Sequence, residues 1–411
     1  MSNRRDFLRT AGAVGVLASA SAMANDERLA KLDTAAKRPV LKKDLFAEPV
    51  ILETVELLRH GDNFICRVRS TEGAQGLSVS HNAKMVDLYP VAINRVLPFF
   101  VKKDARELDA LVDEVYVHQS NYKLQGLALW IPLATVEFAI LDLLGKIAGR
   151  SMGQLLGEIH HPQVAIYQAN NFRGLSAEES IRRIERSVKQ SAAQAVKFKV
   201  GGRMRQVDRP RGRTEKLIAL MRETFGPKMT IYADANGAYN VPEAIRIGRL
   251  LQEQQIDFYE EPVPFDWYEE TRQVADALEI PIAGGEQEPS LRNFRWLIGK
   301  GALQICQPDL FYFGGMIRSL RVARMAQAAG LTCTPHISGT GLGYLYMLHF
   351  VSALPNAGPF HEFKGLSRDI PFACDSSSLK SEAGRITVPT GPGDGLVIAP
   401  DFLRKHKPVR A

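Results

Sequence analysis

The fold is decided by two short stretches: residues 229–236 read MTIYADAN, and residues 256–262 read IDFYEEP. In each stretch a short apolar run ends in a carboxylate, Asp234 in the first and Glu260 in the second. Short apolar runs of this kind are typical of buried parallel strands that give way to loops. The two stretches therefore predict neighbouring strands that each present an acid at the carboxyl end.

Four other stretches follow the same pattern: VKFK at 196–199, GGE at 284–286, QPD at 307–309 and TPH at 334–336. From Asp234 to His336 their final residues recur every 23 to 27 positions, the length of one strand plus one helix. A β/α barrel assembles its active site in this way, from the ends of successive strands at one rim. We expect eight strands, enough to close a barrel, at residues 164–169, 195–200, 229–234, 256–260, 280–284, 303–309, 331–336 and 357–363.

The pattern changes on either side of this barrel, which we place at residues 161–380. Residues 45–160 begin with two alternating runs around a turn at His60–Asn63 and continue with apolar residues at helical spacing, which predicts an α+β domain. Residues 25–44 are charged and lack periodicity, so we expect a linker or arm. Residues 381–411 are too few for another strand–helix unit and are expected to pack back on the first domain.

The composition is that of an ordinary globular protein, with 45% hydrophobic and 24% charged residues in a chain of 411. The formal net charge of +7 is small and scattered, which disfavours nucleic-acid binding. The one basic cluster, Arg203 to Arg213, is interpreted as a solvated loop, with an anionic-ligand or oligomer contact as the alternative.

Four cysteines, Cys66, Cys306, Cys333 and Cys374, lack the spacing of a metal site. An oxidising compartment would permit a disulfide, but we expect them to be small buried residues.

The N-terminus has the features of an export signal. Arg4 and Arg5 precede Phe7, Leu8 and a short apolar run that ends in the AMA motif of residues 22–24. The run is too short to span a membrane, so it predicts a cleaved signal peptide over residues 1–24. The paired arginines resemble a twin-arginine export signal, which predicts the export machinery as a partner, a periplasmic location and no membrane attachment after cleavage.

Three carboxylates, Asp234, Glu260 and Glu286, are expected to converge at the barrel rim. They would repel one another strongly unless a cation lay among them, and all-oxygen ligation suits Mg²⁺. Asn236 follows Asp234 on the same face of its strand and is a candidate substrate contact or a support for the metal ligands.

Lys197 and Lys199 alternate around Phe198, so both point to one face of their strand. Two ammonium groups in a barrel mouth would lower each other's pKa, and a lysine so tuned can remove a proton near neutral pH. Lys199 is our candidate base, and Lys197 a candidate ligand of the substrate carboxylate.

Asp309 and His336 end neighbouring strands, where the carboxylate would fix the imidazole tautomer and raise its pKa for acid–base work. Glu362, at the end of the eighth strand, could hydrogen-bond a substrate carboxylate, particularly if protonated.

This ordered set resembles the mandelate racemase branch of the enolase superfamily, the mandelate racemase/muconate lactonizing enzymes. The resemblance implies an N-terminal α+β capping domain over a modified (β/α)7β TIM-like barrel. It also implies that a Mg²⁺ ion on three carboxylates stabilises the enediolate formed when a carboxylate substrate loses its α-proton. Asp234, Glu260 and Glu286 match the ligands; Lys199, His336 with Asp309, and Glu362 match the catalytic positions. The turn at His60–Asn63 is shorter than the substrate-covering loop of many members, so specificity could come from residues 78–84.

Three outcomes are open for such a site: dehydration of an acid sugar (aldonate or aldarate) to a 2-keto-3-deoxy acid, racemisation or epimerisation, and cycloisomerisation. We favour dehydration, since it is the commonest outcome that this branch implies. A periplasmic sugar-acid binding protein without activity is the alternative of a different class. We also expect a homo-oligomer.

Overall fold

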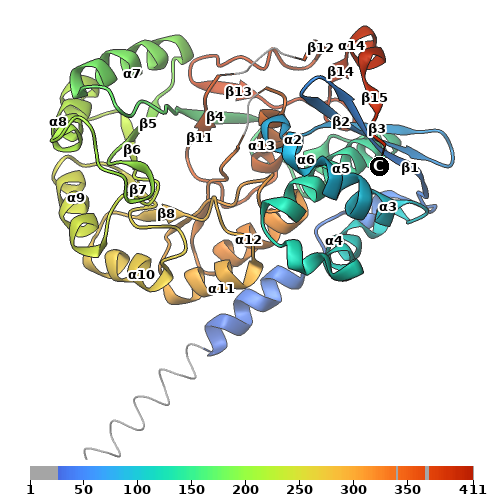
Figure 1. Ribbon diagram of the computed structural model, residues 1–411, viewed down its shortest axis with the longest axis horizontal. Coiled ribbons are helices and arrows are strands. Elements are labelled where there is room, and N and C mark those ends of the chain that lie inside the picture. Colours follow the sequence, from blue (N-terminus) through green and yellow to red (C-terminus); the bar gives the residue numbers. More distant parts are fainter. Residues whose placement is uncertain (1–25, 339–340, 366–369, 411) are drawn as a thin grey trace, which may run out of the picture.

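The computed structural model describes residues 26–338, 341–365 and 370–410. The expected signal peptide lies outside these residues. The described chain forms a capping domain and a barrel (Figure 1), and the main hydrophobic core contains residues of both, such as Phe64 and Val136 from the first and Phe311 and Tyr346 from the second.

The capping domain begins with the hairpin that the two alternating runs predict, extended by a third strand. Its strands are β1 (Leu52–His60), β2 (Asn63–Ser70) and β3 (Gln75–Val79), all antiparallel. The turn between β1 and β2 is short because Gly61 adopts a positive φ of 58°. The helices that follow are α2 (Asn82–Val91), α3 (Leu97–Phe100), α4 (Leu108–Val117), α5 (Leu127–Ala148) and α6 (Met152–Leu156).

Helix α5 is long and apolar enough to cross a membrane by length and composition alone. However, 89% of its most apolar window is buried, and it packs against β2 and β3. It is therefore the central helix of the capping domain.

The barrel has its eight parallel strands where the sequence predicts them. They are β4 (Gln163–Gln168), β5 (Ala195–Lys199), β6 (Thr230–Asp234), β7 (Phe258–Glu260), β8 (Ile282–Gly284), β9 (Ile305–Cys306), β10 (Thr332–Cys333) and β11 (His361–Phe363). The pairing order is β10-β9-β8-β7-β6-β5-β4-β11, and an isolated bridge from Cys333 to Ala357 closes the ring. Strands β9 and β10 are shorter than expected because Pro308 and Pro335 have no N–H to donate to the ladder.

Seven helices alternate with these strands and cover the outside of the barrel (Figure 1). They are α7 (Ala177–Ser191), α8 (Arg213–Phe225), α9 (Val241–Glu253), α10 (Tyr268–Ala277), α11 (Leu291–Lys300), α12 (Met316–Ala328) and α13 (Gly343–Ser352). Because β11 is followed by no such helix in the described chain, the architecture is (β/α)7β.

The C-terminal segment contacts both domains. It contains β12 (Phe372–Ala373), β13 (Arg385–Thr387), β14 (Val397–Ile398), α14 (Pro400–Lys405) and β15 (Lys407–Pro408). Strand β13 pairs with β4 of the barrel, whereas β15 adds a fourth strand to the capping sheet beside β1.

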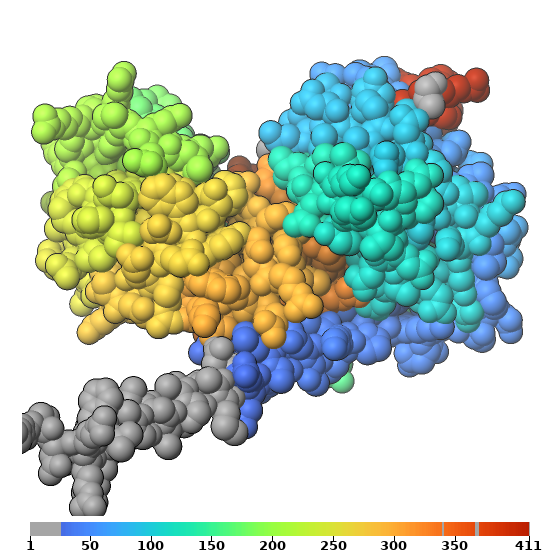
Figure 2. All heavy atoms as spheres, turned by 60° about the horizontal axis from the view of Figure 1, so that its bottom comes forward, coloured from blue at the N-terminus to red at the C-terminus, as the bar shows by residue number. Residues whose placement is uncertain are grey.

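The N-terminal arm differs from its prediction, because residues 26–37 form a helix. Leu32 of this helix is fully buried, and Gly299 of α11 allows the approach: a Cβ there would lie 2.5 Å from Leu29. In Figure 2 the helix, in blue, runs beneath the orange residues near 300. The few apolar residues of this helix pack against the barrel. They are too few to produce a helical pattern in the sequence.

All four cysteines are free thiols. Cys66, Cys306 and Cys333 are fully buried, as expected for small apolar residues, whereas Cys374 is partly exposed.

Candidate active site in the barrel mouth

The three predicted carboxylates lie at the carboxyl ends of three successive strands. Asp234 ends β6 and is the register partner of Glu260, which ends β7. Glu286 follows two residues after β8. Their exposed fractions are only 0%, 1% and 8%, so each needs a cation or hydrogen-bond donors to remain ionised.

Two lysines of β5 contact these acids. The Lys197 ammonium lies 2.8 Å from both oxygens of Glu260, 3.6 Å from Asp234 and 3.5 Å from Glu362. The Lys199 ammonium contacts the Asp234 carboxylate and donates to the Asn236 amide oxygen at 3.2 Å. Asn236 has a positive φ of 45° and so leaves the strand direction to reach Lys199.

The expected lowering of the Lys197 pKa needs correction. Its side chain is 1% exposed, with carboxylates around the ammonium, and its pKa is raised well above the ordinary value. Burial acts in the opposite direction, but the attraction of Glu260 and Glu362 outweighs it. Mutual lowering of the two lysine pKa values is therefore wrong for Lys197, because the acids dominate its surroundings. In this arrangement the Lys197 ammonium contacts the carboxylates of Asp234, Glu260 and Glu362.

On the other side of the mouth, Asp309 and His336 form the predicted pair. The imidazole Nδ1 lies 2.7 Å from Asp309 Oδ2. The same carboxylate accepts from the backbone N–H groups of Phe311 and Tyr312 and from both the N–H and hydroxyl of Ser338. Asp309 therefore fixes the loops after β9 and β10 as well as the imidazole.

The second nitrogen of His336 faces two acids, at 3.2 Å from Glu286 and 3.3 Å from Glu362. The pKa of His336 is raised to about 9: burial opposes the charge, but Glu286 and Glu362 favour it, with a further contribution from Asp309. The predicted increase is thus present, with the two facing acids contributing more than the paired one.

The surroundings of Glu362 favour its ionised form rather than the protonated one. Burial would raise its pKa, but Lys197, Lys364 and His336 together hold it well below the usual range. The carboxylate lies 3.3 Å from Lys364, and its Oε2 accepts no hydrogen bond within the described chain.

Several residues of this site were not identified from the sequence. Gln307 donates to Glu260 at 2.9 Å, and Glu261, next to the predicted ligand, is buried with a raised pKa because of burial and the neighbouring acids. From the capping domain, His81 reaches the barrel, where its ring stacks on Tyr312 with its Nδ1 unpartnered. Gln307 and Glu261 stand within or beside the predicted strand-end motifs, and His81 lies in the stretch 78–84 from which specificity was expected. The sequence therefore indicated their neighbourhoods but not their contacts.

The basic cluster of the sequence divides into two parts. Arg203, Arg205, Arg209 and Arg211 are exposed, as expected of a solvated loop. Arg213 is instead buried at the start of α8, where it donates to the carbonyls of Lys199, Phe172 and Leu175. It fastens the loops around the base of the candidate site.

The donor set fits a hard divalent cation. No group of three acidic, histidine or cysteine side chains in the described chain is already gathered at ligand distance, because each of the three acids points to Lys197, Lys199 or His336. Yet the pKa of Glu260 is raised to about 7 by burial and by Asp234, with Glu286 adding to it, so these carboxylates repel one another. A bound Mg²⁺ ion would reduce the repulsion between these buried, adjacent carboxylates, and their oxygen atoms are the ligands that this ion prefers.

Comparison with known proteins gives the same grouping. The sequence profile of the family "Enolase C-terminal domain-like" matches residues 179–402. An arabinonate dehydratase of Saccharolobus solfataricus is 27% identical over 83% of this chain and 89% of its own, and a D-galactarolactone cycloisomerase of Agrobacterium fabrum is 28% identical over 75% and 82%.

Solved structures agree. A provisionally assigned racemase from Roseobacter denitrificans is 32% identical with a TM-score of 0.79, over 87% of this chain and 99% of its own. A mandelate racemase/muconate lactonizing protein from Paracoccus denitrificans, complexed with magnesium, is 25% identical with a TM-score of 0.78, over 88% and 99%. The chain therefore belongs to the mandelate racemase branch of the enolase superfamily.

Proposed function

We propose that this member of the enolase superfamily is a Mg²⁺-dependent dehydratase of acid sugars, aldonates or aldarates, which begins by removing the proton next to the substrate carboxylate. Asp234, Glu260 and Glu286 would hold the ion, which supplies positive charge for the substrate carboxylate. Such a proton is very weakly acidic, so the charge that develops on the carboxylate must be stabilised for the reaction to proceed.

The observation that carries the proposal is the placement of two proton-transfer groups around one group of acids. Lys199 lies on β5 and His336 follows β10, with β6 to β9 between them along one side of the ring. Both contact a candidate ligand: Lys199 touches Asp234, and His336 lies 3.2 Å from Glu286. A substrate held at these acids would have one proton-transfer group on each face.

The remaining residues position these groups. Asp309 holds Nδ1 of His336, so the other nitrogen points into the mouth and can give or take a proton. Oε2 of Glu362 lies 3.3 Å from that nitrogen without accepting a hydrogen bond in the described chain, and it would orient the substrate carboxylate or a hydroxyl. Lys197 and Gln307 fix Glu260 from two sides.

For dehydration, Lys199 as the neutral amine removes the α-proton and becomes the ammonium, and protonated His336 delivers a proton to the departing β-hydroxyl, so that water leaves. The enol that remains takes up a proton at the β-carbon to give the 2-keto-3-deoxy acid. Support comes from relatives named as arabinonate, galactonate and gluconate dehydratases. Cycloisomerisation, in which an internal nucleophile replaces the leaving hydroxyl, is the second candidate, supported by the D-galactarolactone cycloisomerase relative.

The experiment is a panel of aldonic and aldaric acids with Mg²⁺, read by appearance of the keto product. Turnover of at least one acid, lost on dialysis into chelator and restored by Mg²⁺, is the expected result. Racemised or cyclised acid instead of keto product would replace dehydration by the alternative chemistry, and full turnover in chelator would refute the metal site.

The location of the enzyme is part of the same proposal. Residues 1–24 carry the twin-arginine-like signal, and the chain would be exported folded and act in the periplasm. Mass spectrometry of the protein from a periplasmic fraction should show cleavage after Ala24. An intact N-terminus in a cytoplasmic fraction would refute this.

A further inference from the structure

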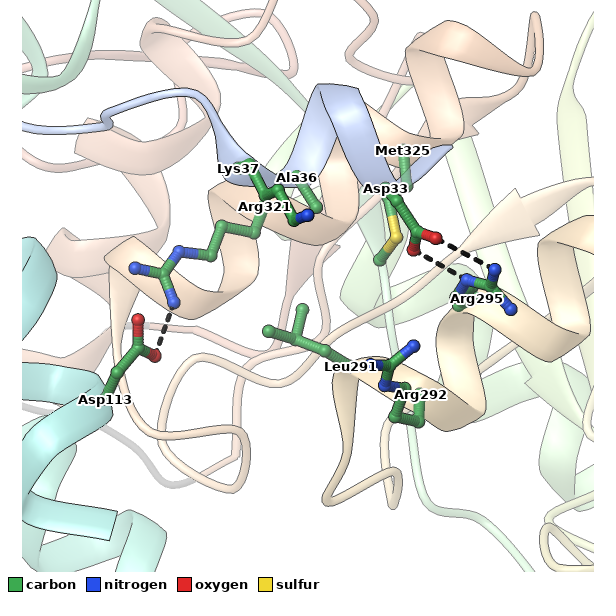
Figure 3. Close-up of a pocket in the computed structure, with 9 residues that line it drawn as sticks. All are labelled: Asp33, Ala36, Lys37, Asp113, Leu291, Arg292, Arg295, Arg321 and Met325. Carbon is green, nitrogen blue, oxygen red and sulfur yellow. Dashed lines mark hydrogen bonds and ion pairs between the residues drawn. The ribbon is translucent and has the colours of Figure 1, made fainter. Parts of the chain in front are cut away.

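A cavity of about 340 Å³ lies on the outer wall of the barrel, away from the mouth. Figure 3 shows it between the N-terminal helix of residues 26–37, in blue, and the helices α11 and α12. Part of its wall is apolar, since Leu291 projects into the middle of the space and Met325 comes from α12.

Two arginines of this cavity are already neutralised. Arg295 makes a bidentate pair with Asp33, at 2.6 and 2.8 Å, which fastens the N-terminal helix to α11. Arg321 lies 2.7 Å from Asp113 of α4 and donates to the backbone carbonyl of Asp109. In Figure 3 these two pairs stand at opposite ends of the space.

Two further cations line the same cavity without an acidic partner. Lys37 of the N-terminal helix and Arg292 of α11 make no ion pair within the described chain. Both act electrostatically on Asp33, whose pKa is lowered chiefly by its bond to Arg295 and further by Arg292 and Lys37. The Asp33 carboxylate is thus already occupied, and the cavity keeps an excess of two positive charges beside an apolar surface.

We propose that this cavity binds a small dicarboxylic acid with an apolar body, whose carboxylates pair with Lys37 and Arg292. An inorganic anion would satisfy the charges but leave the half-buried side chains of Leu291 and Ala36 in contact with water, whereas an organic body would cover them. Because Lys37 belongs to the N-terminal helix and Arg292 to the barrel, the bound anion fastens that helix to the barrel wall.

The test is titration calorimetry of the full-length protein with adipate, at constant ionic strength set with sodium chloride. The variant Lys37→Gln/Arg292→Gln removes the two unpartnered charges. Its matched control, Lys31→Gln/Lys300→Gln, removes two exposed charges from the same two helices outside the cavity. Melting temperatures check that both double variants are folded.

We expect adipate to bind the wild type and the control equally, and the cavity variant at least about tenfold more weakly, since two charge-assisted bonds are lost. Adipate should also slow amide exchange in residues 26–37 of the wild type but not of the cavity variant. Absence of binding to the wild type, equal weakening in both double variants, or unchanged affinity in the cavity variant would each overturn the proposal. None of these results depends on turnover.

Discussion

Two of the regions that hold buried acids in this protein differ in their surroundings. In the barrel mouth, Asp234, Glu260 and Glu362 face the ammonium groups of Lys197 and Lys199 or the imidazole of His336. At the junction between the capping domain and the barrel, Glu137 of α5 is just as buried but accepts only from backbone N–H groups, those of Met316 and Ile317 at the start of α12.

The difference appears in their protonation. The pKa of Glu362 is held well below its usual range by Lys197, Lys364 and His336 in spite of burial, whereas burial raises the pKa of Glu137 to about 8. One oxygen of Glu137 also lacks a hydrogen-bond partner in the described chain. The facing cations therefore favour the ionised form of Glu362, whereas burial favours the neutral form of Glu137, which caps α12. Burial alone does not distinguish a functional acid from a structural one, because the groups that face the acid also decide its protonation.

The largest expected effect is the difference in turnover between a variant of the mouth and a variant of the junction. Glu260→Gln should reduce turnover by on the order of 10³-fold or more, because it removes a charge that the reaction requires. Glu137→Gln, equally buried, should leave turnover within about threefold, because this acid is neutral and remote from the mouth. Steady-state kinetics on both folded variants measures this difference in turnover. Similar losses of turnover in the two variants would contradict it.

A smaller effect is expected within the mouth. Asp309→Asn should lower turnover by roughly 10- to 100-fold, less than His336→Asn, because the amide keeps the shape but not the charge that orients the imidazole. Near-UV circular dichroism should confirm that the loops held by Asp309 remain in place. Turnover lost to the same extent in both variants would mean that Asp309 does more than position His336.

The pH dependence of stability tests whether Glu137 is protonated at the junction. Glu137 has a folded pKa of about 8, above the ordinary value of 4.5, so the folded state binds the extra proton. Its stabilising contribution is complete below about pH 4.5 and is lost as the pH rises through 8, by roughly 1.4 kcal/mol for each pH unit between these two values. Glu137→Gln should therefore flatten the decline of the melting temperature between about pH 5 and 8.5. A decline of unchanged slope would show that Glu137 ionises freely in the folded protein.

The smallest effect concerns an exposed pair far from both regions. Asp33→Asn should cost about 1 kcal/mol or less, since the bidentate partner Arg295 is partly exposed and screened by water. Urea unfolding at low and high salt measures it. A loss of several kcal/mol would mean that the N-terminal helix is an integral part of the barrel.

The sequence predicts the barrel well because its strand ends are repeated. Asp234, Glu260 and Asp309 each follow a short apolar run at regular spacing, and the structure brings all of them to one rim. The spacing could not show which carboxylate each lysine contacts. Lys197 and Lys199 share a strand face, but their different depths place one beneath Glu260 and the other beside Asp234.

Long-range contacts account for the rest. His81 lies far from Tyr312 in the sequence, and only the packing of the capping domain on the barrel brings them together. Glu137 sits inside an apolar helix, where nothing local indicates that it caps α12. Gly315 is required by this close approach, because a Cβ there would lie 2.3 Å from the Glu137 carboxylate. A single glycine in a sequence does not predict such a contact, since glycines occur for many reasons.

The central claim, removal of a proton next to the substrate carboxylate, is tested most directly by deuterium uptake. Arabinonate, galactonate and gluconate would each be incubated with the enzyme and Mg²⁺ in D2O and followed by NMR. We predict that solvent deuterium enters the α-carbon of recovered acid or the β-carbon of the keto product, and that the double variant Lys199→Met/His336→Asn incorporates none. Conversion of any of these acids by the wild type without deuterium at either carbon would contradict it.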